Sequence, residues 1–230
     1  MSVKNNYEKI YKKLAIEFSN DLNAEDFPNI PELYLPLYGE FYSKLKEKIL
    51  IVGIETNGWG NMVDFISQSK SQPKKAICRN FGSFRNLDFL NWGINFGTSF
   101  WDFNFKFLAN FYGIDDWKLI KNGQKDKIVK SFAWGNCNSL EGFNVTARDK
   151  GAEYDKWKLL KHKSKNVDKL EYQLKALEPD YVLITNWNAK EKWITDNDEN
   201  FQKEIIDKYI HYYFLPKFET HIIKTAHPRF

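Results

Sequence analysis

The stretch KILIVGIETNGWG, residues 48–60, decides the fold expected for this chain. Its first half is an apolar run, and its second half is polar and rich in turn-forming residues. A short apolar run with such an ending is typical of a strand covered on both faces of a parallel sheet. We predict this strand over residues 48–55, so the carboxylate of Glu55 stands at its end, where such sheets bind ligands.

Three other stretches have the character of buried strands. They are short, apolar or β-branched, bounded by Gly, Asn or Pro, and cover residues 129–135, 180–186 and, more weakly, 221–226. Helical patterns lie among and before them, at residues 4–19, about 38–47, 100–112 and 167–177, the last stopped by Glu178-Pro179. This alternation predicts an α/β protein, a three-layer α/β/α sandwich with a central, mainly parallel four-stranded sheet.

Length and composition indicate a folded, single-domain chain. At 230 residues one core suffices, so we expect one domain over residues 1–230, with residues 1–47 as an N-terminal helical extension packed on it. An apolar share of 43% and an aromatic share of 17% are too high for a disordered protein. The longest purely apolar run is about six residues, 49–54, so we expect no membrane span and a cytoplasmic, monomeric protein.

The charged and sulfur-containing residues narrow the function classes. The net charge of +4 permits a nucleic-acid partner without requiring one. Basic residues gather at residues 70–85 and 156–169, and such runs are either solvated faces or surfaces that follow phosphates. The two cysteines, Cys78 and Cys137, exclude a four-thiolate metal site built by this chain alone. We expect no metal and no cofactor.

Glycines after the first strand do not make a nucleotide-binding loop. Gly53 and Gly58 have the spacing of a P-loop, but Trp59-Gly60 stands where its Lys and Ser/Thr belong. The sequence also has no G-x-S-x-G or H-E-x-x-H motif.

Polar residues at the strand ends are the candidate functional groups, and each has a structural alternative. Glu55 is either a water-activating base or a cap of the following turn, and His227 is either a functional imidazole or a surface residue. Asn136 either reads a hydrogen-bonding edge or ties down its loop. Aromatic residues between positions 92 and 101, among them Phe96 and Phe100, are either core or a stacking platform.

The order and spacing of these segments resemble the uracil-DNA glycosylase superfamily. Gly53-Ile54-Glu55-Thr56-Asn57 resembles the loop after the family's first strand, and FAWGN, residues 132–136, resembles its Asn-bearing second strand. The run PDYVLITN, residues 179–186, and the ending HIIKTAHP, residues 221–228, resemble the third and fourth strands. The resemblance covers the sequence from about residue 48 to residue 230. Three residues depart from the family pattern: Glu55 replaces its Asp or Asn, Thr56 replaces its Pro, and Arg229 replaces the Ser after His-Pro.

The resemblance implies a DNA glycosylase that hydrolyses the N-glycosidic bond of uracil or a related damaged pyrimidine. Glu55 would orient water and balance the sugar cation, and His227 would donate a hydrogen bond to the departing base. Asn136 would read the base edge, Gly53 would belong to the substrate-binding loop, and Phe96 or Phe100 would stack on the flipped base. Asn57 and Arg229 would hold flanking phosphates.

The same resemblance suggests the DNA partner and leaves one alternative open. In the family, residues after the His-Pro motif form a loop that wedges into duplex DNA, whereas this sequence stops at Phe230. We therefore expect single-stranded or flexible DNA as the substrate. The alternative is a non-catalytic nucleic-acid or nucleobase-binding protein that retains the glycosylase fold.

Overall fold

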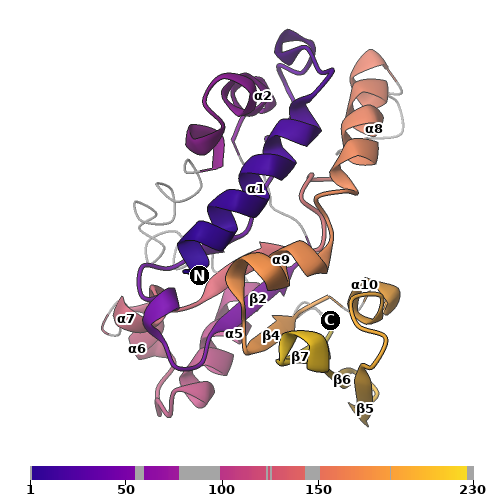
Figure 1. The fold of residues 1–230 in the computed structure, drawn as a ribbon. Coiled ribbons are helices and arrows are strands. Elements are labelled where there is room, and N and C mark those ends of the chain that lie inside the picture. Colours follow the sequence, from indigo (N-terminus) through magenta and orange to yellow (C-terminus); the bar gives the residue numbers. More distant parts are fainter. Residues whose placement is uncertain are drawn as a thin grey trace.

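The computed structural model describes residues 2–54, 60–77, 99–122, 124, 126–142, 151–186 and 188–226. These residues form a mixed α/β protein with one seven-stranded mixed sheet. Figure 1 shows the sheet crossing the molecule, with the long helix α1 lying over it. The strands are β1 (Leu37–Tyr38), β2 (Ile49–Gly53), β3 (Ala133–Asn136), β4 (Tyr181–Ile184), β5 (Gln202–Asp207), β6 (Ile210–Leu215) and β7 (Thr220–Thr225).

The centre of the sheet is parallel. The strand order is β1-β3-β2-β4-β7-β6-β5, and the neighbours within β3-β2-β4-β7 are parallel. These four are the strands predicted from the sequence. Their carboxyl ends share one edge, and the register pairs Gly53 at the end of β2 with Asn136 at the end of β3.

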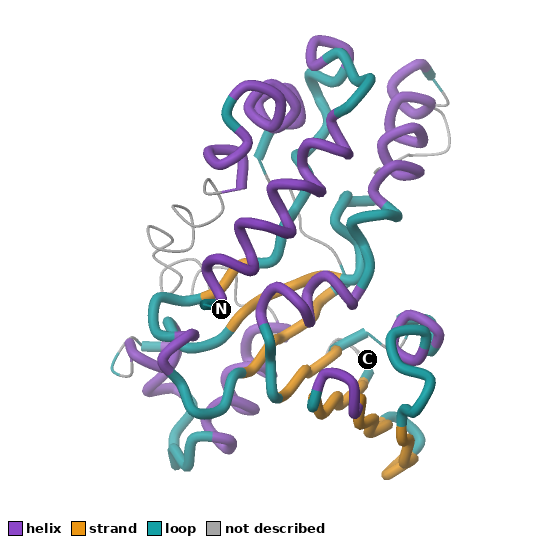
Figure 2. Tube along the Cα trace, viewed as in Figure 1, coloured by secondary structure: helices purple, strands orange, loops and turns teal. Residues whose placement is uncertain are grey.

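Helices cover both faces of this sheet because its central strands are apolar on both sides. In β2, Leu50 and Val52 join the buried cluster that includes α1, α2, α8 and α9, whereas Ile49 and Ile51 join the cluster with α5, α6 and α7. Figure 2 shows the strands in orange as a row through the fold, flanked by purple helices. The helices are α1 (Val3–Ser19), α2 (Met62–Ser71), α5 (Ser99–Phe111), α6 (Lys118–Lys121), α7 (Asp126–Val129), α8 (Ala152–Ser164), α9 (Leu170–Leu177) and α10 (Lys192–Thr195).

The four-stranded sheet predicted from the sequence is too small. Antiparallel strands extend it at both edges: β1 pairs with β3, and the hairpin of β5 and β6 pairs with β7 through β6. The hairpin was not predicted because every residue of β5 is exposed, so this strand carries no apolar face for a pattern to reveal. No helix among the described residues is long and apolar enough to cross a membrane.

Helix predictions near the N-terminus and around β3 need correction. Residues 38–47 contain the end of β1 and the 3-10 turn η2 (Tyr42–Lys44) in place of the predicted helix, and a 3-10 turn η1 (Ala24–Asp26) precedes them. The strand predicted from residue 129 begins at Ala133, because the preceding residues form α7. The predicted end of α9 is confirmed, since Glu178 adopts the left-handed conformation with φ 48° before Pro179.

The N-terminal helix α1 begins and packs as its sequence predicts. The Ser2 hydroxyl accepts a hydrogen bond from the Asn5 backbone N–H at 3.4 Å, which caps the helix. Tyr7, Tyr11, Leu14 and Phe18 form its buried face. These side chains belong to the same cluster as Leu50 of β2, so α1 contributes to the main core.

Candidate functional site at the carboxyl edge of the parallel strands

Three of the eight candidate residues chosen from the sequence can be placed, and the structure brings these three together. Gly53 ends β2, Asn136 ends β3, and Phe100 lies in the first turn of α5. The other five lie outside the described residues, namely Glu55, Asn57, Phe96, His227 and Arg229.

Gly53, Asn136 and Phe100 lie close together at this edge of the sheet. A Cβ atom built on Gly53 would lie 2.8 Å from Asn136 Oδ1 and 3.4 Å from Phe100 Cε2. The missing side chain of Gly53 therefore leaves the space in which the other two groups approach the backbone. Phe100 also packs edge-on against Trp101, with ring centroids 4.8 Å apart.

The Asn136 carboxamide is the most unusual polar group of the site. Asn136 is only 4% exposed, yet neither its Oδ1 nor its Nδ2 has a hydrogen-bond partner in the part of the chain that the structure describes. Leaving a buried polar group unpaired costs roughly 1–3 kcal/mol of stability. A carboxamide offers both an acceptor and a donor, so a bound group with the complementary edge would recover this loss.

Gln173 of α9 fixes the end of β3 from the opposite face of the sheet. Its Nε2 donates to the backbone carbonyl of Asn136 at 2.9 Å. This contact needs a glycine at the preceding position, because a Cβ on Gly135 would lie 2.0 Å from Gln173 Oε1. Gln173 was missed in the sequence, where it reads as one more polar residue of an amphipathic helix.

A cavity of about 460 Å³ opens beside this site, where the chain leaves β2, β3 and β4. Its lining includes Cys137 and Trp193, which pack against the cluster of α1 and α9, whereas Phe100 packs against the α5 cluster. The cavity and the Asn136 carboxamide therefore lie toward opposite faces of the sheet. The full lining is Ile54, Cys137, Asn138, Lys165, Asp168, Lys169, Asn186, Asn188, Ala189, Lys190 and Trp193.

Two titratable groups of the cavity are tuned by burial. Burial raises the pKa of the Cys137 thiol to about 12, which leaves it protonated and a poor nucleophile at neutral pH. Burial also raises the pKa of Asp168, and hydrogen bonds from the Ser139 hydroxyl and backbone N–H (2.6 Å for the latter) oppose that effect. Asp168 thus ties the loop after β3 to the loop before α9.

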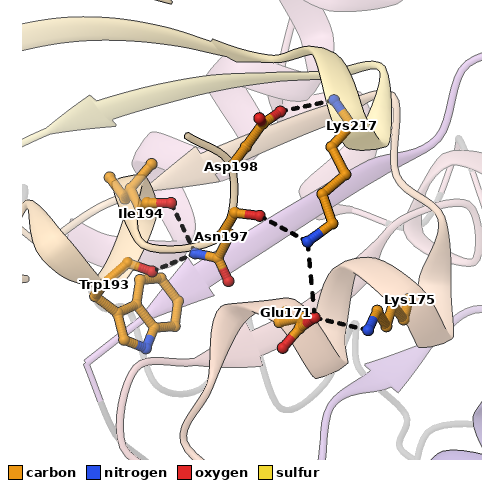
Figure 3. Close-up of polar contacts among 7 residues, drawn as sticks. All are labelled: Glu171, Lys175, Trp193, Ile194, Asn197, Asp198 and Lys217. Atoms are coloured by element: carbon orange, nitrogen blue, oxygen red, sulfur yellow. Dashed lines mark hydrogen bonds and ion pairs between the residues drawn. The ribbon is translucent and has the colours of Figure 1, made fainter. Parts of the chain in front are cut away.

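The wall formed by α10 is held in place by a polar network, which Figure 3 shows. The Asn197 side chain donates to the carbonyls of Trp193 at 2.8 Å and Ile194 at 2.7 Å. Lys217, between β6 and β7, donates from its backbone N–H to Asp198 at 2.6 Å and from Nζ to the Asn197 carbonyl at 3.1 Å. The Trp193 indole in turn donates to the Asp168 carbonyl at 2.5 Å, so both walls of the cavity are connected.

Comparisons with known proteins add no relative to this description: no family model, no curated protein and no solved structure matches the chain. Within the described ranges, no three His, Cys, Asp or Glu side chains are grouped so that they could hold a metal ion. The function must therefore be argued from the side chains at the carboxyl edge of the sheet.

Proposed function

We propose that the protein is a DNA glycosylase that removes uracil or a related damaged pyrimidine from single-stranded or flexible DNA. The observation that carries the proposal is the buried carboxamide of Asn136, which lies beside Gly53 and Phe100 and has no hydrogen-bond partner among the described residues. A pyrimidine such as uracil offers a carbonyl and an N–H on one edge, which match the donor and acceptor of this carboxamide. The Phe100 ring lies next to them, where it would contact the face of the base.

The proposed reaction uses groups that follow β2 and β7 in the sequence. Cleavage of the glycosidic bond leaves positive charge on the sugar and negative charge on the departing base. Glu55, two residues after Gly53, would orient the attacking water and balance the sugar cation, and His227, two residues after the end of β7, would hydrogen-bond the base oxygen. Asn57 and Arg229 would hold flanking phosphates, and Phe96 would stack on the base if Phe100 does not.

The arrangement of the sheet supports a glycosylase-like, three-layer architecture. The four strands expected from the resemblance are neighbours and parallel, in the order β3-β2-β4-β7. Glu55 and His227 follow β2 and β7 in the sequence, and the carboxyl ends of these two parallel strands, separated by the single strand β4, lie at the same edge of the sheet. The extra strands lie at the outer edges, away from this point.

The decisive assay is excision from a single-stranded oligonucleotide with one uracil. We expect wild-type protein to produce an abasic site and Asn136→Ala to do so about 10²–10³-fold more slowly, because it loses a positioned hydrogen-bonding group. Glu55→Ala and His227→Ala should each lower the rate by about 10²–10⁴-fold. Asn110→Ala, which changes an exposed amide on α5, is the matched control and should retain the wild-type rate.

The free energy of unfolding separates a lost function from a lost fold. Asn136→Ala removes two buried polar atoms that have no hydrogen-bond partner in the described ranges, so its free energy of unfolding should be equal to or above that of wild type. Absence of abasic product from wild type, or undiminished product from Asn136→Ala, would refute the proposed reaction. Binding of free uracil without excision, abolished by Asn136→Ala, would instead identify the non-catalytic base-binding protein.

A further inference from the structure

We infer that the 460 Å³ cavity beyond β2, β3 and β4 is a binding site for a phosphate group carried by a ligand of about nucleotide size. This site is separate from the Asn136 site and does not depend on glycosylase activity. The two lie at the same edge of the sheet but face its opposite sides.

The charge of the cavity favours an anion. Lys165, Lys169 and Lys190 line it, and none of them forms a salt bridge with the described part of the chain. Asp168, the one acidic residue among the described lining residues, accepts hydrogen bonds from Ser139 and Ser164. The described lining therefore carries three cations against one carboxylate, and this excess of positive charge on a concave surface favours phosphate oxygens.

Neutral groups add donors around these cations. Lys169, which lines the cavity, is also the N-cap of α9, so the N-terminus of that helix lies beside the cavity. A helix N-terminus carries partial positive charge and favours an anion. The carboxamides of Asn138 and Asn188 also line the cavity and can donate to phosphate oxygens.

The size and the remaining walls of the cavity indicate how large the ligand is. Pockets for small ligands usually measure about 300–1,000 Å³, so 460 Å³ exceeds what a bare phosphate needs. Ile54, Ala189 and Trp193 supply an apolar wall against which a sugar or a planar ring can pack. The Lys224 ammonium supports this wall, because it donates to the Ala189 carbonyl at 2.5 Å.

The phosphate could belong to a free nucleotide or to a DNA strand, and calorimetry can distinguish these sources. We would titrate the protein with thymidine 5′-monophosphate, with thymidine, and with a short uracil-free single-stranded oligonucleotide. For a free nucleotide we expect binding of the monophosphate, none of thymidine, and competition by inorganic phosphate. For a DNA strand we expect binding of the oligonucleotide alone. A plot of log K against the logarithm of the salt concentration should then have a slope of about −0.7 for each phosphate that the protein contacts.

The variant that tests the site is Lys165→Gln/Lys169→Gln/Lys190→Gln, in which three exposed side chains lose their charge but keep similar length. This variant should bind the monophosphate or the oligonucleotide, whichever wild type binds, at least tenfold more weakly, because hydrogen bonds to charged groups are stronger than those between neutral groups. The matched control is Lys4→Gln/Lys9→Gln/Lys12→Gln on α1, which makes the same charge change at exposed positions.

Wild-type affinity in the cavity variant, equal weakening in the α1 control, or no binding of either phosphorylated ligand to wild type would overturn the inference. Because the oligonucleotide contains no uracil, the result does not depend on excision. The phosphate site can therefore fail while the glycosylase proposal stands, and the reverse also holds.

Discussion

At the scale of single residues, two glycines and two carboxamides shape the end of β3. Gly53 and Gly135 each lack the Cβ atom that would collide with a neighbouring amide oxygen, from Asn136 and Gln173 respectively. The two amides lie on opposite faces of the sheet, and Gln173 fixes the strand whose last side chain is Asn136. Glycine is needed at these two positions because an amide side chain closely approaches the backbone at each of them.

Gly135→Ala tests this packing directly. The new methyl group would meet Gln173 Oε1 at 2.0 Å, so Gln173 must move and give up its 2.9 Å hydrogen bond to the Asn136 carbonyl. We expect a loss of about 1–3 kcal/mol in the free energy of unfolding, measured by urea denaturation. Gln173→Ala should lower the free energy of unfolding less in the Gly135→Ala variant than in wild type, because removing the Gln173 side chain also removes the clash with the new methyl group.

The control for this prediction is Gly151→Ala. Apart from the two chain neighbours, no heavy atom of the described residues lies within 4 Å of a Cβ at Gly151, and its φ of −100° suits any residue. The free energy of unfolding should therefore change by less than about 0.5 kcal/mol. Additive effects of Gly135→Ala and Gln173→Ala would show that the two side chains do not compete for the same space.

At the scale of helices and strands, the sequence predicted the elements that bury apolar residues on two faces and missed those that do not. The runs in β2 and β4 are apolar throughout, which only a covered strand explains. In β5, by contrast, Ile205 and Ile206 are 63% and 59% exposed beside charged neighbours, so periodicity gives no signal. This strand exists because β6 supplies its hydrogen bonds, a tertiary effect that local pattern does not report.

The candidate site was predictable to a similar, limited degree. Polar residues at strand ends could be placed at one edge once the strands were predicted to be parallel, and Gly53, Asn136 and Phe100 do lie together. The side of the sheet that each residue faces could not be predicted, because it depends on the exact register. The contribution of Lys190 to the same cavity as Lys165 also depends on loop paths that have no repeating pattern.

Leu14→Ala tests whether α1 is part of the main core. Leu14 is buried in the cluster that also contains Leu50 and Val52 of β2. We expect a loss of about 2–5 kcal/mol in the free energy of unfolding, with one transition seen equally by circular dichroism and tryptophan fluorescence. Lys12→Ala, exposed on the same helix, should be nearly neutral. A separate early transition would instead make residues 1–47 an independent unit.

At the scale of the whole molecule, the core is unusually rich in tyrosine hydroxyls. Tyr11, Tyr34 and Tyr42 are all essentially fully buried. The Tyr34 hydroxyl donates to the Trp134 carbonyl at 3.0 Å, whereas the hydroxyls of Tyr11 and Tyr42 have no hydrogen-bond partner in the described part of the chain. Burial raises the pKa of all three phenols well above their usual value. The folded state therefore keeps three protons that the unfolded chain releases at high pH.

This difference predicts alkaline unfolding. A phenol whose pKa is raised by folding does not affect stability while the pH is below its unfolded-state pKa of about 10. Above that pH, the free energy of unfolding falls by about 1.4 kcal/mol per phenol for each pH unit. Three phenols together should remove about 4 kcal/mol by pH 11, a large part of a typical domain's stability. Urea denaturation between pH 9 and 11 measures the effect as a falling midpoint.

Tyr11→Phe/Tyr42→Phe should remove the part of the fall that these two phenols cause, about 3 kcal/mol by pH 11, and cost little stability at pH 7, because neither hydroxyl has a hydrogen-bond partner among the described residues. Tyr209→Phe, at an exposed position, should follow the wild-type pH profile. If the double variant instead fell as steeply as wild type between pH 9 and 11, other groups would cause the alkaline loss, and the buried phenols would not be the charge-sensitive part of this core.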